Sequence, residues 1–285
     1  MVGHDGSIEP ESRPQGESWD HSTRQEFLDY YSEASLSQAA QNRFRAQRDI
    51  IVALLEAEGV HGSLSVADIG AGPGASAMLW AELGHRVQGL DVNEALIQVA
   101  RERAEAAGYD IRFEVGSATD LPWAASSMDV CLAPELLEHV PDWESCLDEF
   151  TRILKPGGAL FLSTTNWLCP AQQEFNLPLY SWYPAPLKRY CEELARTSRP
   201  SIANYATYPA VNWFTYWSLR SALALRGHDH FYDRFDMAAA RPQSAAKTRL
   251  LRLISNIPPL RWAGYVCSRG TSIVAIKADG PSAPR

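Results

Sequence analysis

Three glycines at alternate positions, Gly70, Gly72 and Gly74, follow the apolar run 66–69, which includes the acidic residue Asp68. Glycine is needed where a ligand approaches the main chain closely or where φ is positive. Residues 76–83 can form a helix whose N-terminus faces this loop. The stretch predicts a backbone cradle for a nucleotide-like ligand, with two alternatives: a dinucleotide-binding turn or a turn without a ligand.

A carboxylate, Asp91, ends the next apolar run, 17 positions after Gly74. Its two oxygens can accept hydrogen bonds from both hydroxyl groups of a ribose, as acidic residues at this place do in nucleotide-binding sheets. The alternative is that Asp91 only caps the helix that follows. The position therefore favours a ribose-binding role next to the glycine loop.

Glu135, Glu138 and His139 form a second group with chemical potential. If Pro134 occupies the first turn of a helix, these residues stand at i, i+3 and i+4 and share one face. Two carboxylates and an imidazole could then hold a divalent ion that polarises a hydroxyl group. Because Val140 and Pro141 interrupt this short turn, we expect no metal, and a divalent ion remains the alternative.

The surrounding residues alternate between predicted strands and amphipathic helices. We expect strands at 65–69, 86–90, 111–115, 128–132 and 159–164, with helices after the glycine loop and at 94–107 and 143–154. Such alternation predicts an α/β fold with a doubly wound, mostly parallel, Rossmann-like sheet, whose ligands bind at the carboxyl ends of the strands. Two further strands, 231–235 and 271–277, would complete seven strands as an antiparallel, hairpin-like end.

The chain divides into six predicted segments. They are a disordered arm at 1–22, N-terminal helices at 23–62, a ligand-binding core at 63–166, a cap at 167–210, the remainder of the sheet at 211–277 and a flexible tail at 278–285. The arm and tail contain few apolar residues. The cap is long and rich in aromatic residues, which indicates either a substrate-binding cover or a small local core.

Composition narrows the class of protein. The chain has 285 residues, of which 46% are hydrophobic and 21% charged, and its net charge is −8, which argues against a nucleic-acid partner. Its five cysteines have no paired spacing, so neither a disulfide framework nor a zinc site is predicted. Because no signal peptide or long apolar run is present, we expect a cytoplasmic protein that acts on a small molecule.

Five ordered motifs together resemble the class I methyltransferases that use S-adenosyl-L-methionine. They are Asp68-x-Gly-x-Gly-x-Gly, Gly-Leu-Asp91-Val, Gly-Ser-Ala118, Leu-Glu138-His139-Val-Pro-Asp and Leu-Lys-Pro-Gly-Gly. Over residues 66–166 the chain is similar to methyltransferase type 11 and to the ubiquinone-biosynthesis O-methyltransferases. A dinucleotide-binding oxidoreductase would share only the glycine loop and the acidic strand end.

The resemblance implies a role for each matching position. Asp68 and the glycines would surround the methionine part of the cofactor, and Ala133 to Glu135 would line the same part. Asp91 would bind the ribose hydroxyls. Val92 and the Ala118 backbone would contact the adenine. Ser117 stands where relatives usually carry an aspartate, and a serine can still accept from the adenine amino group. The implied cofactor-binding residues are Asp68, Gly70, Gly72, Gly74, Asp91, Val92, Ser117, Ala118, Ala133 and Glu135.

Methyl transfer from a sulfonium requires alignment of the acceptor and exclusion of water, and an oxygen or nitrogen acceptor also needs a base. His139 is the candidate catalytic base, with a packing role as the alternative. The candidate substrate residues follow the fifth strand and precede the next helix: Asn166, Trp167, Trp213 and Tyr216. Transfer to oxygen of an apolar or aromatic small molecule is predicted; transfer to nitrogen or carbon of a metabolite or lipid, and a silent cofactor-binding protein, are the alternatives.

The segment 238–269 contains six basic residues and no acidic one, interleaved with apolar residues. Such a segment can lie on an anionic membrane surface or hold a partner. The alternative is a helix that covers the sheet and keeps its basic face in water. The sequence does not indicate an oligomeric state.

Overall fold

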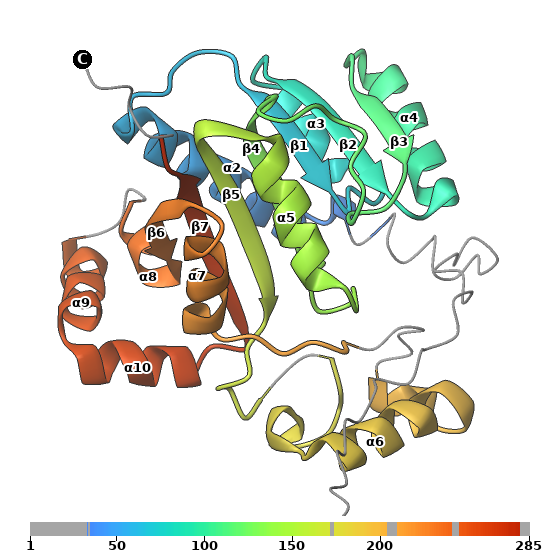
Figure 1. Cartoon of the computed structure of the whole chain (residues 1–285), viewed down its shortest axis with the longest axis vertical. Coiled ribbons are helices and arrows are strands. Elements are labelled where there is room, and N and C mark those ends of the chain that lie inside the picture. Colours follow the sequence, from blue (N-terminus) through green and yellow to red (C-terminus); the bar gives the residue numbers. More distant parts are fainter. Residues whose placement is uncertain (1–32, 34, 172–173, 204–209, 241–244, 280–285) are drawn as a thin grey trace, which may run out of the picture.

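The computed structural model describes residues 33–279, except 34, 172–173, 204–209 and 241–244. A single seven-stranded sheet runs through this part of the chain in the order β3-β2-β1-β4-β5-β7-β6 (Figure 1). The strands are β1 (Ser65–Ile69), β2 (Arg86–Asp91), β3 (Arg112–Val115), β4 (Met128–Pro134), β5 (Leu154–Thr165), β6 (His228–Asp233) and β7 (Gly270–Lys277). The predicted arm and most of the predicted tail lie outside the described residues.

Strands β1 to β5 pair in parallel, whereas β7 is antiparallel to both β5 and β6. The predicted doubly wound, mostly parallel fold class is therefore confirmed. The order of the strands reverses at β1 and β4, since β2 and β3 lie on one side and β5 on the other. In sheets of this kind, ligands bind outside the carboxyl ends of the strands at that reversal.

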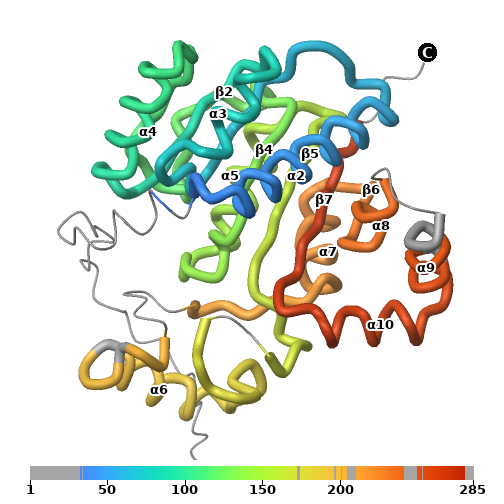
Figure 2. Tube along the Cα trace, turned by 180° about the vertical axis from the view of Figure 1, so that it is seen from behind, coloured from blue at the N-terminus to red at the C-terminus, as the bar shows by residue number. Residues whose placement is uncertain are grey.

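Helices cover both faces of the sheet because alternate strand residues are apolar toward each side. In β4, Cys131 and Ala133 belong to the core under α5 and α7, whereas Val130 and Leu132 belong to the core under α2, α3 and α4 (Figures 1 and 2). The helices are α2 (Gln38–Ala57), α3 (Ala75–Ala81), α4 (Glu94–Ala107), α5 (Trp143–Ile153), α6 (Ala185–Thr197), α7 (Tyr216–Ala224), α8 (Arg234–Ala239), α9 (Ala245–Asn256) and α10 (Pro258–Val266).

The C-terminal third differs from the prediction. Strand β6 ends at Asp233 instead of Phe235, because the Asp233 side chain accepts from the backbone N–H groups of Phe235 and Asp236 and caps α8. Strands β6 and β7 pair as expected, but three helices join them, so this end is not a hairpin. Helices α9 and α10 are separate because Pro258 opens the second one.

The helical turn considered after β4 is not formed. Pro134 is the last residue of β4 and not the first turn of a helix, and Glu135 adopts φ = +49°, which a helix cannot continue. Glu135, Glu138 and His139 therefore do not share a helical face. Farther along the chain, α5 ends at Ile153, and residues 155–158 lie within β5.

No described helix has both the length and the apolar character needed to cross a bilayer.

Candidate functional site

The loop after β1 folds back over the end of β2. The backbone N–H groups of Gly70 and Ala71 both donate to the carbonyl of Leu90, at 2.8 and 3.0 Å. Gly70 and Gly72 have φ values of +73° and +51°, which favour glycine strongly. This local geometry turns the main chain across the carboxyl end of the sheet, as predicted from the glycine spacing.

The glycines of this loop have different roles. A Cβ on Gly72 would meet nothing within 4 Å, so this residue borders open space. A Cβ on Gly74 would lie 2.9 Å from both Ala100 Cβ and Phe113 Cζ, so Gly74 allows α3 to pack closely against α4 and β3. The structure therefore assigns a packing role to Gly74, which was predicted to contact the ligand. Gly89, not singled out from sequence, has the same packing role, because a Cβ on this residue would lie 2.5 Å from Phe113 Cδ1.

Asp91 links the glycine loop to the end of β2. Its Oδ2 accepts from the Gly72 N–H at 2.8 Å, and its Oδ1 accepts from the Asn93 N–H at 2.9 Å. Burial raises the pKa of Asp91, although these backbone hydrogen bonds oppose the shift. Asn93, rather than Asp91, caps α4 by accepting from the Leu96 N–H. Each oxygen of Asp91 can accept a second hydrogen bond, so the carboxylate can still hold two hydroxyl groups.

Asp68 is a buried carboxyl group directly beneath this loop. Its side chain is in β1 and the residue is 1% exposed. Burial, and then the neighbouring charge of Asp91, raise the pKa of Asp68 to about 7, against hydrogen bonds from Ala77 and Ser76. Its Oδ2 has no hydrogen-bond partner within the described part of the chain. A buried acceptor without a donor indicates a place for a cationic or hydrogen-bonding ligand group.

Apolar side chains flank Asp91 on the same edge. Val92 after β2 and Val115 at the end of β3 are each 47% exposed, while Ala118 is buried. Exposed valines at adjacent strand ends provide an apolar surface on which a planar ring can lie. The Ser117 hydroxyl bonds to Thr119 Oγ1 at 2.7 Å, so an adenine amino group would compete with this contact.

A second cluster of polar residues follows the ends of β4 and β5. Glu135 is exposed, and its Oε1 accepts from the Ser163 hydroxyl at 2.6 Å. Glu138 is fully buried, and its Oε2 accepts from the Thr164 hydroxyl at 2.7 Å, whereas its Oε1 has no partner among the described residues. Ala133 is fully buried inside β4, so only its backbone can reach a ligand.

Three glutamates of this cluster influence one another. Burial, and then the charges of Glu135 and Glu174, raise the pKa of Glu138 well above its ordinary value. Burial and Glu135 raise the pKa of Glu174, from the cap, to about 7. Glu138 and Glu174 therefore favour at least partial protonation near neutral pH. Glu174 and Thr164 were missed from sequence because they lie 36 and 26 positions from Glu138.

His139 is half-buried beside Glu138, in a turn closed by its N–H bond to the Leu136 carbonyl at 3.0 Å. Its place next to the glutamate cluster agrees with the predicted site but does not test a catalytic role. Among the described residues, no three or more His, Cys, Asp or Glu side chains are arranged to hold a metal ion.

The four predicted substrate residues lie in different environments. Asn166 is 1% exposed, and its Nδ2 donates to the carbonyls of Tyr265 and Ser268, so it joins β5 to the end of α10. Tyr216 is buried and stacks on Tyr265 with ring centroids 5.5 Å apart. These contacts give both residues a packing or positioning role and no support for acceptor contact.

Of the other two predicted substrate residues, Trp167 lies in the cap and Trp213 borders it. Trp167 is 46% exposed and can be reached from solvent. The Trp213 ring lies under Lys188 Nζ at 4.5 Å and against Tyr180 at 5.6 Å, next to the buried cap core that includes Phe175. The cap thus has its own small core, and α6 lies beyond the carboxyl end of β5 (Figure 1). A hollow of about 360 Å³ in the cap is lined mainly by apolar groups.

Comparison with known proteins identifies the core. Residues 67–162 match the family described as a methyltransferase domain. The chain is similar to the ubiquinone biosynthesis O-methyltransferase of Coxiella burnetii, at 38% identity over 101 residues, 35% of this chain and 43% of that protein. The protein of the same name from Thiobacillus denitrificans is 39% identical over 102 residues, 35% and 44% of the two chains. The chain thus spans less than half the length of these relatives.

Solved structures share the fold. PH0226 from Pyrococcus horikoshii covers 87% of this chain and 98% of its own, with a TM-score of 0.53 and 16% identity. The [4+2]-cyclase SpnF covers 85% and 82%, with a TM-score of 0.51 and 18% identity. Residues 67–162 thus match a methyltransferase domain, and the sheet and the similar relatives support a class I S-adenosylmethionine-dependent methyltransferase fold for this part of the chain.

Proposed function

We propose that this protein binds S-adenosyl-L-methionine at the ends of β1, β2 and β3 and transfers its methyl group to oxygen of a small apolar or aromatic acceptor. The observation that supports the proposal most strongly is the Asp91 carboxylate held against the Gly72 N–H at 2.8 Å, beside the buried Asp68. Together they provide acceptors for a ribose and for a cationic group at the point where the strand order reverses.

The residues present fit this cofactor part by part. Gly72 leaves open space for a ligand, and Asp91 has acceptor capacity for both ribose hydroxyls. Val92 and Val115 offer apolar contact to the adenine. Within the described part of the chain no donor reaches the Asp68 Oδ2, and a methionine amino group would supply one. When bound, the cofactor supplies a methyl group already activated by the positive sulfonium. The chain must then orient the acceptor, exclude water and remove a proton.

The acceptor side is proposed from the cluster at the ends of β4 and β5. Its buried Glu138 has a raised pKa and one carboxyl oxygen without a hydrogen-bond partner among the described residues, which suits a group that takes a proton near neutral pH. His139 is the neighbouring candidate base. The names of the similar O-methyltransferases support oxygen as the methylated atom, and the apolar hollow of the cap supports an apolar acceptor.

Transfer to nitrogen is the second candidate function. Glu135, Glu138 and Glu174 place three carboxyl groups near one another, an arrangement that attracts a protonated amine. The fold alone does not choose between these reactions, because a protein with the same fold is a [4+2]-cyclase. A cofactor-binding protein without transfer remains the outcome if no acceptor is methylated.

A transfer assay with methyl-labelled cofactor tests the proposal. The full-length protein is incubated with parallel panels of catechols and phenols, of amines, and of apolar carbon acids, and each product is located by mass spectrometry. Label on an oxygen of the first panel supports the proposal, and label only on nitrogen or carbon replaces it by an alternative. Cofactor binding with no label in any panel contradicts transferase activity. A repeat after chelation, with and without added Mg²⁺ or Zn²⁺, decides whether a metal is required.

A further inference from the structure

Helices α8, α9 and α10 form an insertion between the two antiparallel strands β6 and β7. Figures 1 and 2 show α9 and α10 at the side of the molecule, beyond the β6 edge of the sheet. The sequence here is distinctive, because residues 238–269 contain no acidic residue in a chain whose net charge is −8. The basic residues of the segment are Arg241, Lys247, Arg249, Arg252, Arg261 and Arg269.

Helix α9 is apolar on two sides. Leu251 and Ile254 pack against the hydrophobic core, as expected for a helix that covers a sheet. Leu250 and Leu253, each one position earlier, are 54% and 50% exposed. A helix with apolar side chains beyond its packed stripe buries the excess against something else, which in a surface position is a partner or a lipid.

Helix α10 continues the exposed apolar surface. Arg261 and Tyr265 face the protein, and Leu260 and Trp262 stand about 100° to either side of Arg261 on the helix. They are 41% and 55% exposed, and Ile257, at the junction of the helices, is 37% exposed. Exposed Arg249 and Arg269 lie at the two ends of this region. The α9–α10 surface is defined as Arg249, Leu250, Leu253, Ile257, Leu260, Trp262 and Arg269.

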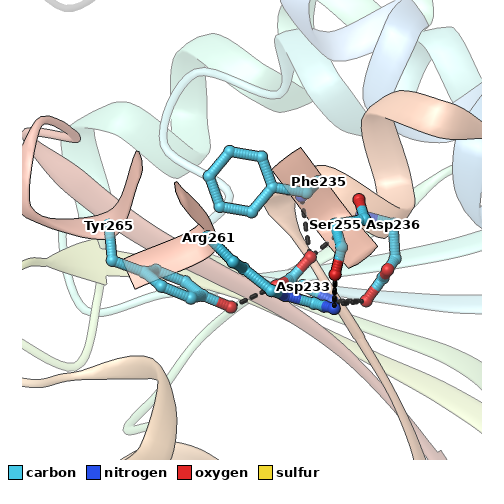
Figure 3. Close-up of polar contacts among 6 residues, drawn as sticks. All are labelled: Asp233, Phe235, Asp236, Ser255, Arg261 and Tyr265. Carbon is cyan, nitrogen blue, oxygen red and sulfur yellow. Dashed lines mark hydrogen bonds and ion pairs between the residues drawn. The ribbon is translucent and has the colours of Figure 1, made fainter. Parts of the chain in front are cut away.

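A buried polar cluster fixes this surface in place. Figure 3 shows Arg261 between the carboxylates of Asp233 and Asp236, with distances of 2.6 and 2.7 Å from its Nη2. The Tyr265 hydroxyl donates to Asp233, which is fully buried at the end of β6. Hydrogen bonds to Arg261 and Tyr265 hold the pKa of Asp233 below its ordinary value against burial. Helix α10 therefore cannot rotate its exposed side inward without breaking the ion pairs of Arg261 with Asp233 and Asp236.

We propose that the α9–α10 surface binds an anionic lipid membrane, lying on it without crossing it. Leucine, isoleucine and tryptophan side chains would enter the interface, while arginines contact anionic headgroups. Tryptophan favours this interface because its ring is apolar and its N–H is polar. A second copy of the chain fits less well, because a two-fold contact through this surface would bring the same arginines together.

Membrane binding here would orient the proposed active site. Asn166, at the end of β5, donates to the carbonyls of Tyr265 and Ser268 at 2.8 and 2.6 Å. Thr165 pairs with Gly270, the residue that follows the α9–α10 insertion. The C-terminal end of α10 therefore adjoins the end of β5, where transfer is proposed, and a membrane held by the α9–α10 surface would let an apolar acceptor come from the lipid. This consequence rests on the proposed function, whereas the lipid contact itself does not.

Vesicle flotation with the full-length protein tests the contact. The protein is mixed at low salt with vesicles of phosphatidylcholine, or of phosphatidylcholine and phosphatidylglycerol. We expect flotation with the anionic vesicles only, and release at high salt, because headgroup attraction is screened. No flotation at low salt, or equal flotation with neutral vesicles, overturns the proposal.

Two double variants locate the surface. R249E/R269E and L253S/W262S should each weaken anionic vesicle binding at least about 30-fold, since each arginine contributes about a fivefold factor and each apolar side chain at least a similar one. The matched controls are R86E/R112E, exposed on β2 and β3, and L225S, at the C-cap of α7, where Leu225 is 88% exposed. Both controls should bind like the unchanged protein.

The cap provides the competing surface, since Trp182 and Tyr190 are 48% and 61% exposed. Lipid binding that survives in L253S/W262S but is lost in W182S/Y190S would overturn the proposal. Calorimetry with S-adenosylmethionine is run on every variant. A variant that binds the cofactor normally but no longer floats has lost only the lipid surface. A variant that also loses cofactor binding has lost its fold or its cofactor site.

Discussion

The two edges of the site are built in different ways. The donor edge, at the ends of β1, β2 and β3, is built from two segments about 20 residues apart: the Gly70 and Ala71 N–H groups bond to the Leu90 carbonyl, and the Gly72 N–H bonds to the Asp91 carboxylate. The acceptor edge, at the ends of β4 and β5, is assembled from distant segments. The Glu138 carbonyl accepts from Val211 and Asn212, and Asn166 reaches Ser268, 102 residues away.

This difference separates the cofactor-binding geometry, which many proteins can share, from the acceptor-binding residues, which are particular to this protein. A cradle of backbone N–H groups and glycines depends on local geometry, so it can serve the same cofactor in many proteins. The family match accordingly covers residues 67–162 and stops before the cap. Side chains at the acceptor edge can change without disturbing the donor edge, which lets acceptors differ among proteins of one fold.

Replacing Asp91 by alanine should have the largest effect on the donor edge. Asp91→Ala removes the acceptors for two ribose hydroxyls, and hydrogen bonds to a charged group are strong, so cofactor affinity should fall at least about 100-fold in calorimetry. The control Asp110→Ala alters an exposed carboxylate before β3 and should leave affinity unchanged. Equal affinities for the two variants would remove Asp91 from the cofactor site.

Gly72 and Gly108 provide a matched pair for the next test. Both have positive φ, +51° and +73°, and an added Cβ would meet nothing within 4 Å at either position. Gly72→Ala and Gly108→Ala should therefore carry similar backbone strain, of about 1–2 kcal/mol. Only Gly72→Ala should weaken cofactor binding, by about tenfold or more, because its methyl group enters ligand space. Similar losses of affinity in both would mean that strain alone is responsible.

Glu138→Gln tests the acceptor edge without changing the shape of the side chain. We expect turnover to fall about 100- to 10,000-fold, the range of a lost general base, while cofactor affinity stays within a factor of about two. The acid limb of the pH–rate profile should disappear. Thr164→Val removes a hydrogen bond that lowers the Glu138 pKa, so it should move that limb to higher pH. An unchanged profile in both variants would exclude Glu138 as the proton acceptor.

Asp68→Asn tests the pH dependence of stability. The pKa of Asp68 is about 7 in the fold against an ordinary value of 3.8, so between these values the folded protein retains a proton that the unfolded chain has lost. Stability of the unchanged protein therefore falls as pH rises through this range. The variant has no carboxyl group at this position and does not lose this stability. The Tm of the variant minus the Tm of the unchanged protein should therefore increase from about pH 4 to about pH 8. A constant difference in Tm would contradict the raised pKa.

The donor half of the fold could be predicted from the sequence because its signals are local. The helix 94–107 agrees with α4 at both ends, since Asn93 caps its start and Gly108 ends it with positive φ. The positions of Asp91 and the glycine loop followed from strand ends and spacing alone. The separate roles of Gly72 and Gly74 did not, because they depend on Phe113 and Ala100, which reach the loop only in the folded chain.

The acceptor half could be predicted only in outline. The left-handed conformation of Glu135 gives no sequence signal, so the helical turn expected at 134–139 was wrong. Asn166 was assigned to the acceptor from its position after β5, but its bonds to Tyr265 and Ser268 arise from tertiary contacts. The predicted position of β6 extended to Phe235, two residues too far, because Asp233 was not recognised as the cap of α8.

Calorimetry of the unchanged protein with S-adenosylmethionine and with S-adenosylhomocysteine tests the central claim most directly. Binding of one molecule per chain, lost in Asp91→Ala and kept in Asp110→Ala, is the result expected from the geometry of the donor edge. The absence of binding by either compound, in protein shown to be folded by its thermal transition, would contradict the account.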